Sequence, residues 1–212
     1  MWAKVMCHFR CEGCQRRSPL NHLDTDGEVS CLRCGERNDF DAGQWLDAID
    51  HAEACARKGG GELRAHGEDR LVPHRIRQKT LVTRATGGHP TCRRCAAALT
   101  VVRCKVGMLV VACSACDREW KYVLPRGTRA SRPQLGGVIA AAHRRGETTA
   151  RVVEGEGSLA VECAQCGAAV STPDSQVVVG CDYCGISLSI PANALPPDRD
   201  LEPEAWWLYF PG

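Results

Sequence analysis

The chain of 212 residues has few aromatic side chains, 5% of the total, and no long apolar run. No segment approaches the roughly 18 consecutive apolar residues of a membrane-spanning helix, and the first residues lack the apolar stretch of a signal peptide. The seven histidines form neither His-x3-His nor His-Glu-x-x-His, and no phosphate-binding glycine loop or nucleophile elbow occurs. These absences exclude the common membrane, secreted and catalytic motif classes. We therefore expect a soluble, cytoplasmic protein that is not an enzyme.

Cysteine, by contrast, is abundant: 12 of the 15 cysteines form six Cys-x-x-Cys pairs. The pairs fall into three consecutive couples, with 16, 17 and 14 residues between the inner cysteines. This spacing is typical of a tetrahedral zinc site, because each pair supplies two thiolates from one tight turn. We therefore predict three structural Zn²⁺ ions. Their ligands are Cys11, Cys14, Cys31 and Cys34; Cys92, Cys95, Cys113 and Cys116; and Cys163, Cys166, Cys181 and Cys184.

Other interpretations of the cysteines are a disulfide framework and redox Cys-x-x-Cys chemistry. The missing export signal favours metal over disulfides. A module of about 40 residues also buries too little apolar surface to fold unaided, and a structural metal commonly supplies the deficit. Cys7, Cys55 and Cys104 lie outside the pairs. His8, beside Cys7, is an alternative ligand at the first site, although an incidental strand position is favoured.

The local pattern predicts mostly strands and one clear helix. Asp41 is a suitable N-cap, and an apolar stripe of Trp45, Ile49, Ala52 and Ala56 follows at helical spacing. We expect this stripe to pack on the first metal module. A treble clef, in which the helix itself carries the second ligand pair, fits less well because six residues separate the last cysteine from the N-cap.

Further elements are predicted on both sides of this helix. Residues 18–23 and 28–30 are expected to form a hairpin, and strands are expected at 99–102, 108–112, 118–124, 159–162, 169–172, 177–180 and 186–190. A second helix is predicted over 133–145. The expected organisation is a first zinc ribbon plus amphipathic helix (1–60), a basic linker with an edge strand (61–90), a second ribbon (91–128), a linker with a helix (129–153), a third ribbon (154–192) and an acidic, aromatic tail (193–212).

At its cysteine pairs the chain resembles the zinc-ribbon superfamily, over three blocks of about 30 residues. The resemblance implies a small, metal-stabilised, β-rich fold: three tandem three-stranded ribbons with one or two short helices, and two cysteine knuckles per zinc. Each knuckle favours a small residue after its second cysteine, where φ is positive. Gly35, Gly167 and Gly185 comply, whereas Gln15, Ala96 and Asp117 depart. The second ribbon departs at both knuckles, so we expect its site to be the least secure.

The resemblance leaves the metal and the function open in part. Rubredoxin holds iron with the same four-thiolate pattern, although three tandem copies favour structural zinc. A site closed by four cysteines has no position for substrate. Function must therefore be sought in the residues between the knuckles.

Charge is segregated along the chain. Residues 91–151 carry a net +9 and residues 152–212 a net −8, and a Zn²⁺ ion with four thiolates adds −2 at each site. Arginine outnumbers lysine 22 to 5, as in proteins of GC-rich bacterial genomes, so part of this charge is ordinary surface. The basic centre also suits nucleic acid, with an aromatic ring for stacking. The candidate nucleic-acid-binding residues are Arg93, Arg94, Arg103, Lys105, Arg118, Lys121 and Trp120.

Four of the 11 aromatic residues lie in the last seven positions: Trp206, Trp207, Tyr209 and Phe210. An exposed aromatic cluster of this kind would promote non-specific association, so either it docks on one of the chain's own modules or it anchors a protein partner. We expect a non-catalytic zinc-binding interaction or assembly subunit, an adaptor. The alternative is a nucleic-acid-binding protein that uses the basic centre.

Overall fold

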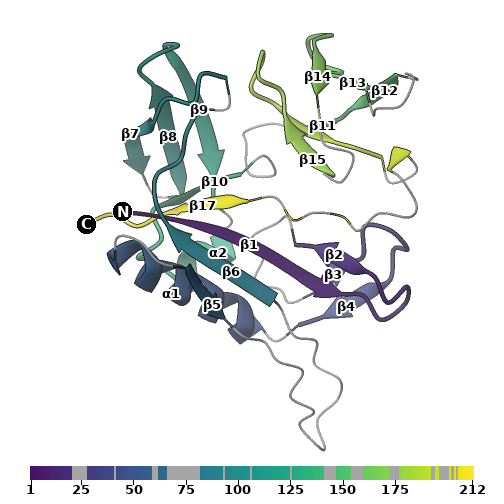
Figure 1. The fold of residues 1–212 in the computed structure, drawn as a ribbon, viewed down its shortest axis with the longest axis horizontal. Helices are drawn as coiled ribbons and strands as arrows, with labels where there is room; N and C mark the ends of the chain where they lie inside the picture. Colours follow the sequence, from purple (N-terminus) through teal and green to yellow (C-terminus); the bar gives the residue numbers. More distant parts are fainter. Residues whose placement is uncertain are drawn as a thin grey trace, which may run out of the picture.

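The computed structural model describes residues 1–20, 28–40, 42–58, 62–65, 82–92, 94–105, 107–124, 126–140, 147–153, 160–171, 177–191, 194–195, 201, 203 and 205–212. Within these ranges the fold is rich in β-structure and contains two helices (Figure 1). No helix in the described ranges has the length and apolar character needed to cross a membrane.

A six-stranded sheet joins the two ends of the chain. Its order is β10 (Gly137–Ile139), β17 (Trp206–Tyr209), β1 (Trp2–Arg10), β6 (Val82–Gly87) and β5 (Glu62–Ala65), and β2 (Arg17–Pro19) also pairs with β1. The Met1 ammonium donates to the Phe210 carbonyl at 2.7 Å. The segment expected to be a linker with an edge strand thus holds both β5 and β6, and the expected tail holds β17 (Figure 1).

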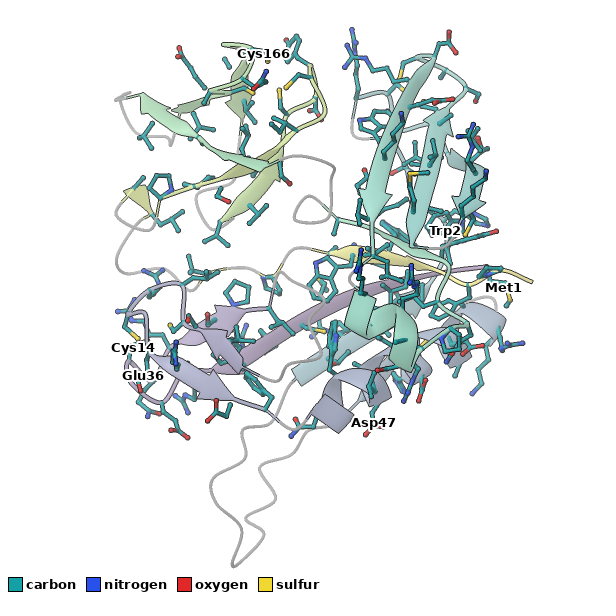
Figure 2. All side chains as sticks on the ribbon, turned by 180° about the vertical axis from the view of Figure 1, so that it is seen from behind. Met1, Trp2, Cys14, Glu36, Asp47 and Cys166 are labelled. Atoms are coloured by element: carbon teal, nitrogen blue, oxygen red, sulfur yellow. The ribbon has the colours of Figure 1, made fainter. Side chains whose placement is uncertain are left out.

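The central pair of strands, β1 and β17, presents two different faces. Ala3 lies opposite Leu208 and Val5 opposite Trp206, and all four side chains are buried in one core with α1 (Ala42–Lys58). Because side chains alternate along a strand, the next residues belong to the other face. There Trp207 packs against the core of the second cysteine module. Figure 2 shows Met1 and Trp2 beneath that module and Cys14 at the opposite end of β1.

Helix α1 confirms the predicted amphipathic stripe, which packs on the first strand of the first module and on later strands of the same sheet. Trp45, Ile49, Ala52 and Ala56 are all buried. Their neighbours include β1, the strand that leads into the first Cys-x-x-Cys pair, together with β6 and β17 from later parts of the chain, and Trp45 meets the Trp206 ring edge-on at 5.2 Å. The helix therefore covers one face of the sheet that the chain ends complete. Its predicted N-cap residue lies outside the described ranges.

The second predicted helix is wrong over residues 133–140. The helix in this region is α2 (Arg126–Ser131), and residues 137–139 instead form β10 beside β17. The Gly136 amide donates to the Tyr209 carbonyl at 2.8 Å. A Cβ at Gly137 would lie 2.6 Å from Leu109, so the two glycines let β10 approach the neighbouring strands closely. Residues 141–145 lie outside the described ranges.

The predicted hairpin of the first module also has the wrong partners. β2 pairs with β1, and β3 (Glu28–Ser30) pairs with β4 (Arg37–Asp39), so each strand pairs across its own Cys-x-x-Cys turn. In the second module β7 (Leu99–Lys105), β8 (Met108–Cys113) and β9 (Arg118–Val123) form an antiparallel sheet, at the predicted positions.

In the part of the third module that the structure describes, six strands form two sheets. β11 (Glu147–Thr149), β16 (Ser187–Ser189) and β15 (Val178–Gly180) form one sheet; β12 (Arg151–Val153), β13 (Ala160–Glu162) and β14 (Ala169–Ser171) form the other. The last four strands predicted from the sequence are confirmed, whereas β11 and β12 were not foreseen. One aliphatic core lies between the sheets, and Leu32 of the first module packs against it.

Candidate metal centres and basic surfaces

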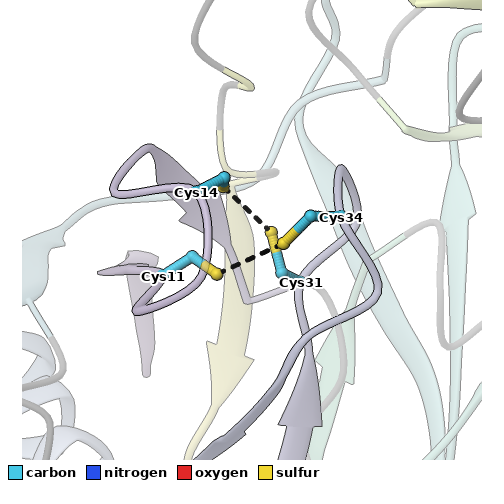
Figure 3. Close-up of side chains that lie close together, drawn as sticks. All are labelled: Cys11, Cys14, Cys31 and Cys34. Atoms are coloured by element: carbon cyan, nitrogen blue, oxygen red, sulfur yellow. Dashed lines mark hydrogen bonds between the residues drawn. The ribbon is translucent and has the colours of Figure 1, made fainter.

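Three groups of four cysteines converge in the structure, and they are the three predicted sets. In each group the four Sγ atoms lie within 4.8 Å of one another. Figure 3 shows the first group, in which Cys11 and Cys14 come from one turn and Cys31 and Cys34 from a second turn facing it. We call these sites the first, second and third four-cysteine groups. They are the arrangements of three or more His, Cys, Asp or Glu side chains that could hold a metal within the described ranges.

The sulfur separations match a metal-sized tetrahedron. Two cross-turn Sγ–Sγ distances are 3.5 and 3.8 Å in the first group, 3.7 and 3.3 Å in the second, and 3.5 and 3.7 Å in the third. Four thiolates at about 2.3 Å from a Zn²⁺ ion lie about 3.8 Å apart. None of the 15 cysteines forms a disulfide. The donor sets therefore fit a metal, and the disulfide framework is not what the structure shows.

All six Cys-x-x-Cys turns share one backbone geometry. The residue after each second cysteine has a positive φ, between 50° and 77°. Its amide donates to the carbonyl of the first cysteine of the pair at 2.8–3.0 Å. Gln15, Ala96 and Asp117 adopt this left-handed conformation although they are not glycine. The second four-cysteine group, expected to be the least secure, therefore has the same geometry as the others.

The surroundings of the thiols favour partial ionisation. Burial opposes ionisation of Cys11, but hydrogen bonds from the Cys14 and Gly13 amides and from neighbouring thiols outweigh it and lower its pKa to about 7. Burial likewise opposes ionisation of Cys113 and Cys163, but hydrogen bonds from neighbouring thiols and backbone amides outweigh it and lower the pKa of each thiol to about 7. One thiol in each group is therefore partly ionised near neutral pH.

Full ionisation of a group requires a cation. The Glu36 amide favours ionisation of Cys34, yet burial and hydrogen bonds with the other three thiols raise its pKa to about 12. Neighbouring thiolates repel one another, so the second, third and fourth protons leave with increasing difficulty. A divalent ion removes this penalty. The chemistry of the donor set thus agrees with its geometry.

Two of the three remaining cysteines are core residues, and neither belongs to a four-cysteine group. Cys7 is buried, with its Sγ 3.6 Å from the Thr83 hydroxyl, and burial raises its pKa to about 12. Cys55 is buried on α1 and donates to the Ala85 carbonyl. Both thiols therefore serve the core of the central sheet rather than a metal.

Cys104 and His8 also lie outside the three groups. Cys104 is exposed and donates to the Gly136 carbonyl at 3.3 Å. His8 sits on β1 opposite Pro19. The alternative of His8 as a ligand at the first site is therefore not what the structure shows.

The predicted basic residues divide between the two faces of the β7–β9 sheet. Val110 of β8 lies between Arg103 of β7 and Lys121 of β9, and Met108 of β8 lies opposite Lys105 of β7. Because Met108 and Val110 share a face of β8, all three cations lie on that face. We call Arg103, Lys105 and Lys121 the open basic face. A bulge immediately before Arg103 leaves Val102 51% exposed beside them.

The other candidates belong to the opposite face. Trp120 lies opposite the buried Val111, and Arg118 lies opposite Cys113. Arg94 lines the same hollow as these two residues. Arg93 lies outside the described residues. The candidates thus form two separate surfaces. The sequence carried a signal for this division, because the side chains of Trp120 and Lys121 are neighbours on one predicted strand and must point to opposite faces.

The aromatic end of the chain packs on the protein itself. Trp206 and Phe210 are 0% and 1% exposed in the core beneath α1, so neither ring is available to a partner in this fold. Trp207 and Tyr209 are half-buried against the second module. Of the two alternatives for the tail, docking on one of the chain's own modules is what the structure shows. Partner binding by Trp207 and Tyr209 stays a prediction.

Comparisons of the chain with protein-family models, with curated proteins and with solved structures find no match. Its function must therefore be argued from its own residues.

Proposed function

We propose that the chain is a non-catalytic assembly subunit built on three structural zinc ribbons. The observation that carries the proposal is the convergence of each four-cysteine group, in which the four sulfurs all lie within 4.8 Å of one another and can fill the four positions around one ion. Such a site leaves no position for water or substrate, so the metal serves the fold. Thiolate ligands suit both zinc and iron. Three tandem copies in one chain are typical of structural sites and favour zinc.

Elemental analysis tests the metal. We expect three zinc ions per chain and loss of folded structure on chelation. Iron in place of zinc, seen as visible charge-transfer absorption, would contradict the metal assignment. A count of one or two would show that at least one of the three groups does not bind the metal.

The adaptor role is supported by the second knuckle of the third four-cysteine group. Tyr183 stands between Cys181 and Cys184 and is 70% exposed. An aromatic ring on a turn that is fixed at both ends loses little freedom when it is covered, and aromatic residues are common interface hot spots. We therefore assign the partner-binding surface to this knuckle rather than to the buried tail.

Affinity capture with Tyr183→Ala tests this assignment. We expect the variant to keep its zinc and to lose a specific protein partner that the parent chain retains. Val152→Ala is the matched control, because Val152 is an exposed apolar residue, 38% accessible, in the same module. Capture that is equal in parent and both variants would contradict the assignment.

Nucleic-acid binding is a second candidate, supported by the open basic face. Arg103, Lys105, Lys121 and the exposed Val123 lie on one face of the β7–β9 sheet, and the exposed Val102 lies at the bulge beside them. Binding through these cations should weaken steeply with salt. The triple variant Arg103→Ala, Lys105→Ala, Lys121→Ala should remove this binding, whereas Arg57→Ala, Lys58→Ala, Arg126→Ala should not. If the parent chain binds no nucleic acid at low salt or at high salt, this candidate function is excluded.

A further inference from the structure

A hollow lies where the second and third modules meet the central sheet. Its volume is about 230 Å³. Three cations and three aromatic rings line it: Lys4, Arg94, Arg118, Trp120, Tyr122 and Trp207. In Figure 1 the β7–β9 sheet and the strand β15 stand side by side above β17 and β1. We call this hollow the cleft.

The floor of the cleft is one row of side chains across the central sheet. Ile139, Trp207 and Lys4 lie directly opposite one another on β10, β17 and β1, so they share a face. Trp207 is packed against Gly88, where φ is +156° and a Cβ would lie 3.3 Å from the indole. The floor therefore offers a positioned indole with a lysine beside it.

The wall of the cleft is one face of β9. Arg118, Trp120 and Tyr122 alternate along the strand and so point to the same side. Arg118 donates to the Asp182 carbonyl, which links this wall to the third module. The Trp120 ring lies 3.9 Å from the position that a Cβ on Gly185 would occupy. Both modules thus border the cleft, and their contacts position its aromatic wall.

The charges in the cleft favour an anion. Within the described residues Lys4 and Arg94 form no ion pair, and Asp182 is the single acid among the lining residues. Cys92 also lines the cleft, so a metal-bound second four-cysteine group adds negative charge at that end. Lys4 comes from β1, outside every four-cysteine group. It is therefore the cation best placed to hold an anionic group of a ligand.

We propose that the cleft binds a single nucleotide, with the base between the indole of the floor and the aromatic wall and the phosphate at Lys4. Stacking of a base on an aromatic side chain contributes roughly 1–3 kcal/mol. The volume lies below the roughly 300–1,000 Å³ of drug-sized pockets, so it suits one base rather than two. The site is separate from the open basic face. The nucleotide can be free or can belong to a single-stranded nucleic acid, since both present the same base and phosphate.

Calorimetry and tryptophan fluorescence on the zinc-loaded full chain test the proposal. The probes are AMP, CMP, adenosine, inorganic phosphate and a short single-stranded oligonucleotide. We expect AMP or CMP to bind and to quench tryptophan fluorescence, and to bind more tightly than adenosine or phosphate alone. Tighter binding of the oligonucleotide than of the mononucleotides identifies a strand as the source. The reverse order identifies a free nucleotide.

Paired variants locate the site. Lys4→Gln should weaken AMP binding roughly tenfold, as expected for loss of one charge-assisted hydrogen bond, and should leave adenosine binding unchanged. Trp120→Phe should retain most of the binding, whereas Trp120→Leu should remove the stacking contribution of the wall and reduce the quenching to the part that Trp207 contributes. Lys121→Gln is the matched control, because it removes a lysine from the opposite face of β9. Zinc content and circular dichroism report whether each variant folds.

Three outcomes would overturn the proposal. The first is the absence of binding by either mononucleotide at millimolar concentration. The second is equal binding of phosphate and AMP, since the rings would then contribute nothing. The third is an equal effect of Lys121→Gln and Lys4→Gln, which would place the ligand on the open basic face. A folded Lys4→Gln variant keeps the test decisive if the Trp120 variants do not fold.

Discussion

The second and third four-cysteine groups have the same knuckle geometry but are supported differently. Behind the second lie strands of seven, six and six residues in one antiparallel sheet. Around the third, β15 and β16, which flank its second Cys-x-x-Cys turn, have three residues each. The third has glycine at both left-handed positions, whereas the second has Ala96 and Asp117 there. Strands this short are marginally stable alone. The comparison predicts that the long sheet tolerates strained knuckles, and that the third module depends more than the second on a metal held by its four cysteines.

The largest expected effect is loss of one metal ligand. Cys181→Ser should remove one zinc and unfold the third module, because zinc contributes on the order of 10–16 kcal/mol to small metal domains. Cys113→Ser should also remove one zinc but should leave part of the β7–β9 sheet protected. Hydrogen exchange at Leu188 and Leu109 measures the difference. Cys104→Ser, outside the groups, should keep all three ions. Equal loss of protection in both modules would break the comparison.

A smaller effect is expected from removing a ring of the central sheet. Trp206→Ala should destabilise the protein by about 3–5 kcal/mol, since the ring is fully buried against Trp45. The neighbouring residue Trp207 packs on the second module, so protection there should fall while the third module keeps its zinc. Denaturant unfolding and hydrogen exchange measure this. Tyr183→Ala, which removes an exposed ring, should change stability by less than about 0.5 kcal/mol.

Exchanging the residues at the left-handed positions should give effects of opposite sign. Gly185→Ala forces an alanine to φ +77° and should cost about 1–2 kcal/mol. Asp117→Gly relieves strain at φ 50°, partly offset by the greater freedom of glycine in the unfolded chain, and should stabilise by up to about 1 kcal/mol. Thermal unfolding of the two zinc-loaded variants checks both signs. Destabilisation by Asp117→Gly would show that the aspartate side chain stabilises the fold by more than its positive φ costs.

The smallest expected effect is kinetic. In the zinc-loaded protein iodoacetamide should modify Cys104 alone, because Cys7 and Cys55 are buried and the other thiols hold metal. Partial burial raises the pKa of Cys104, so this reaction should be slow at neutral pH and faster above it. During mild chelation the cysteines of the third module should be modified several-fold sooner than those of the second. Mass spectrometry of timed samples gives the order, and simultaneous modification would contradict it.

Local spacing was sufficient for the metal ligands but not for strand partners. All twelve cysteines of the three groups could be read from the Cys-x-x-Cys pairs, since two thiols three residues apart share one turn whatever surrounds them. The strands of the second module were also predictable, because their apolar alternation is local. By contrast, the helix predicted at 133–145 has the right apolar period, yet β10 forms because β17, at the far end of the chain, offers it an edge.

The three four-cysteine groups, the residues that form them and the buried stripe of α1 follow from local sequence patterns. The pairing of the two chain ends in one sheet, the burial of Trp206 and Phe210, and the division of the basic candidates between an open face and a cleft become visible only in the folded chain. The two kinds of feature differ because the underlying interactions differ in range. A knuckle or a helical stripe is specified within a few residues, whereas sheet pairing and burial depend on segments that meet only after the chain has folded.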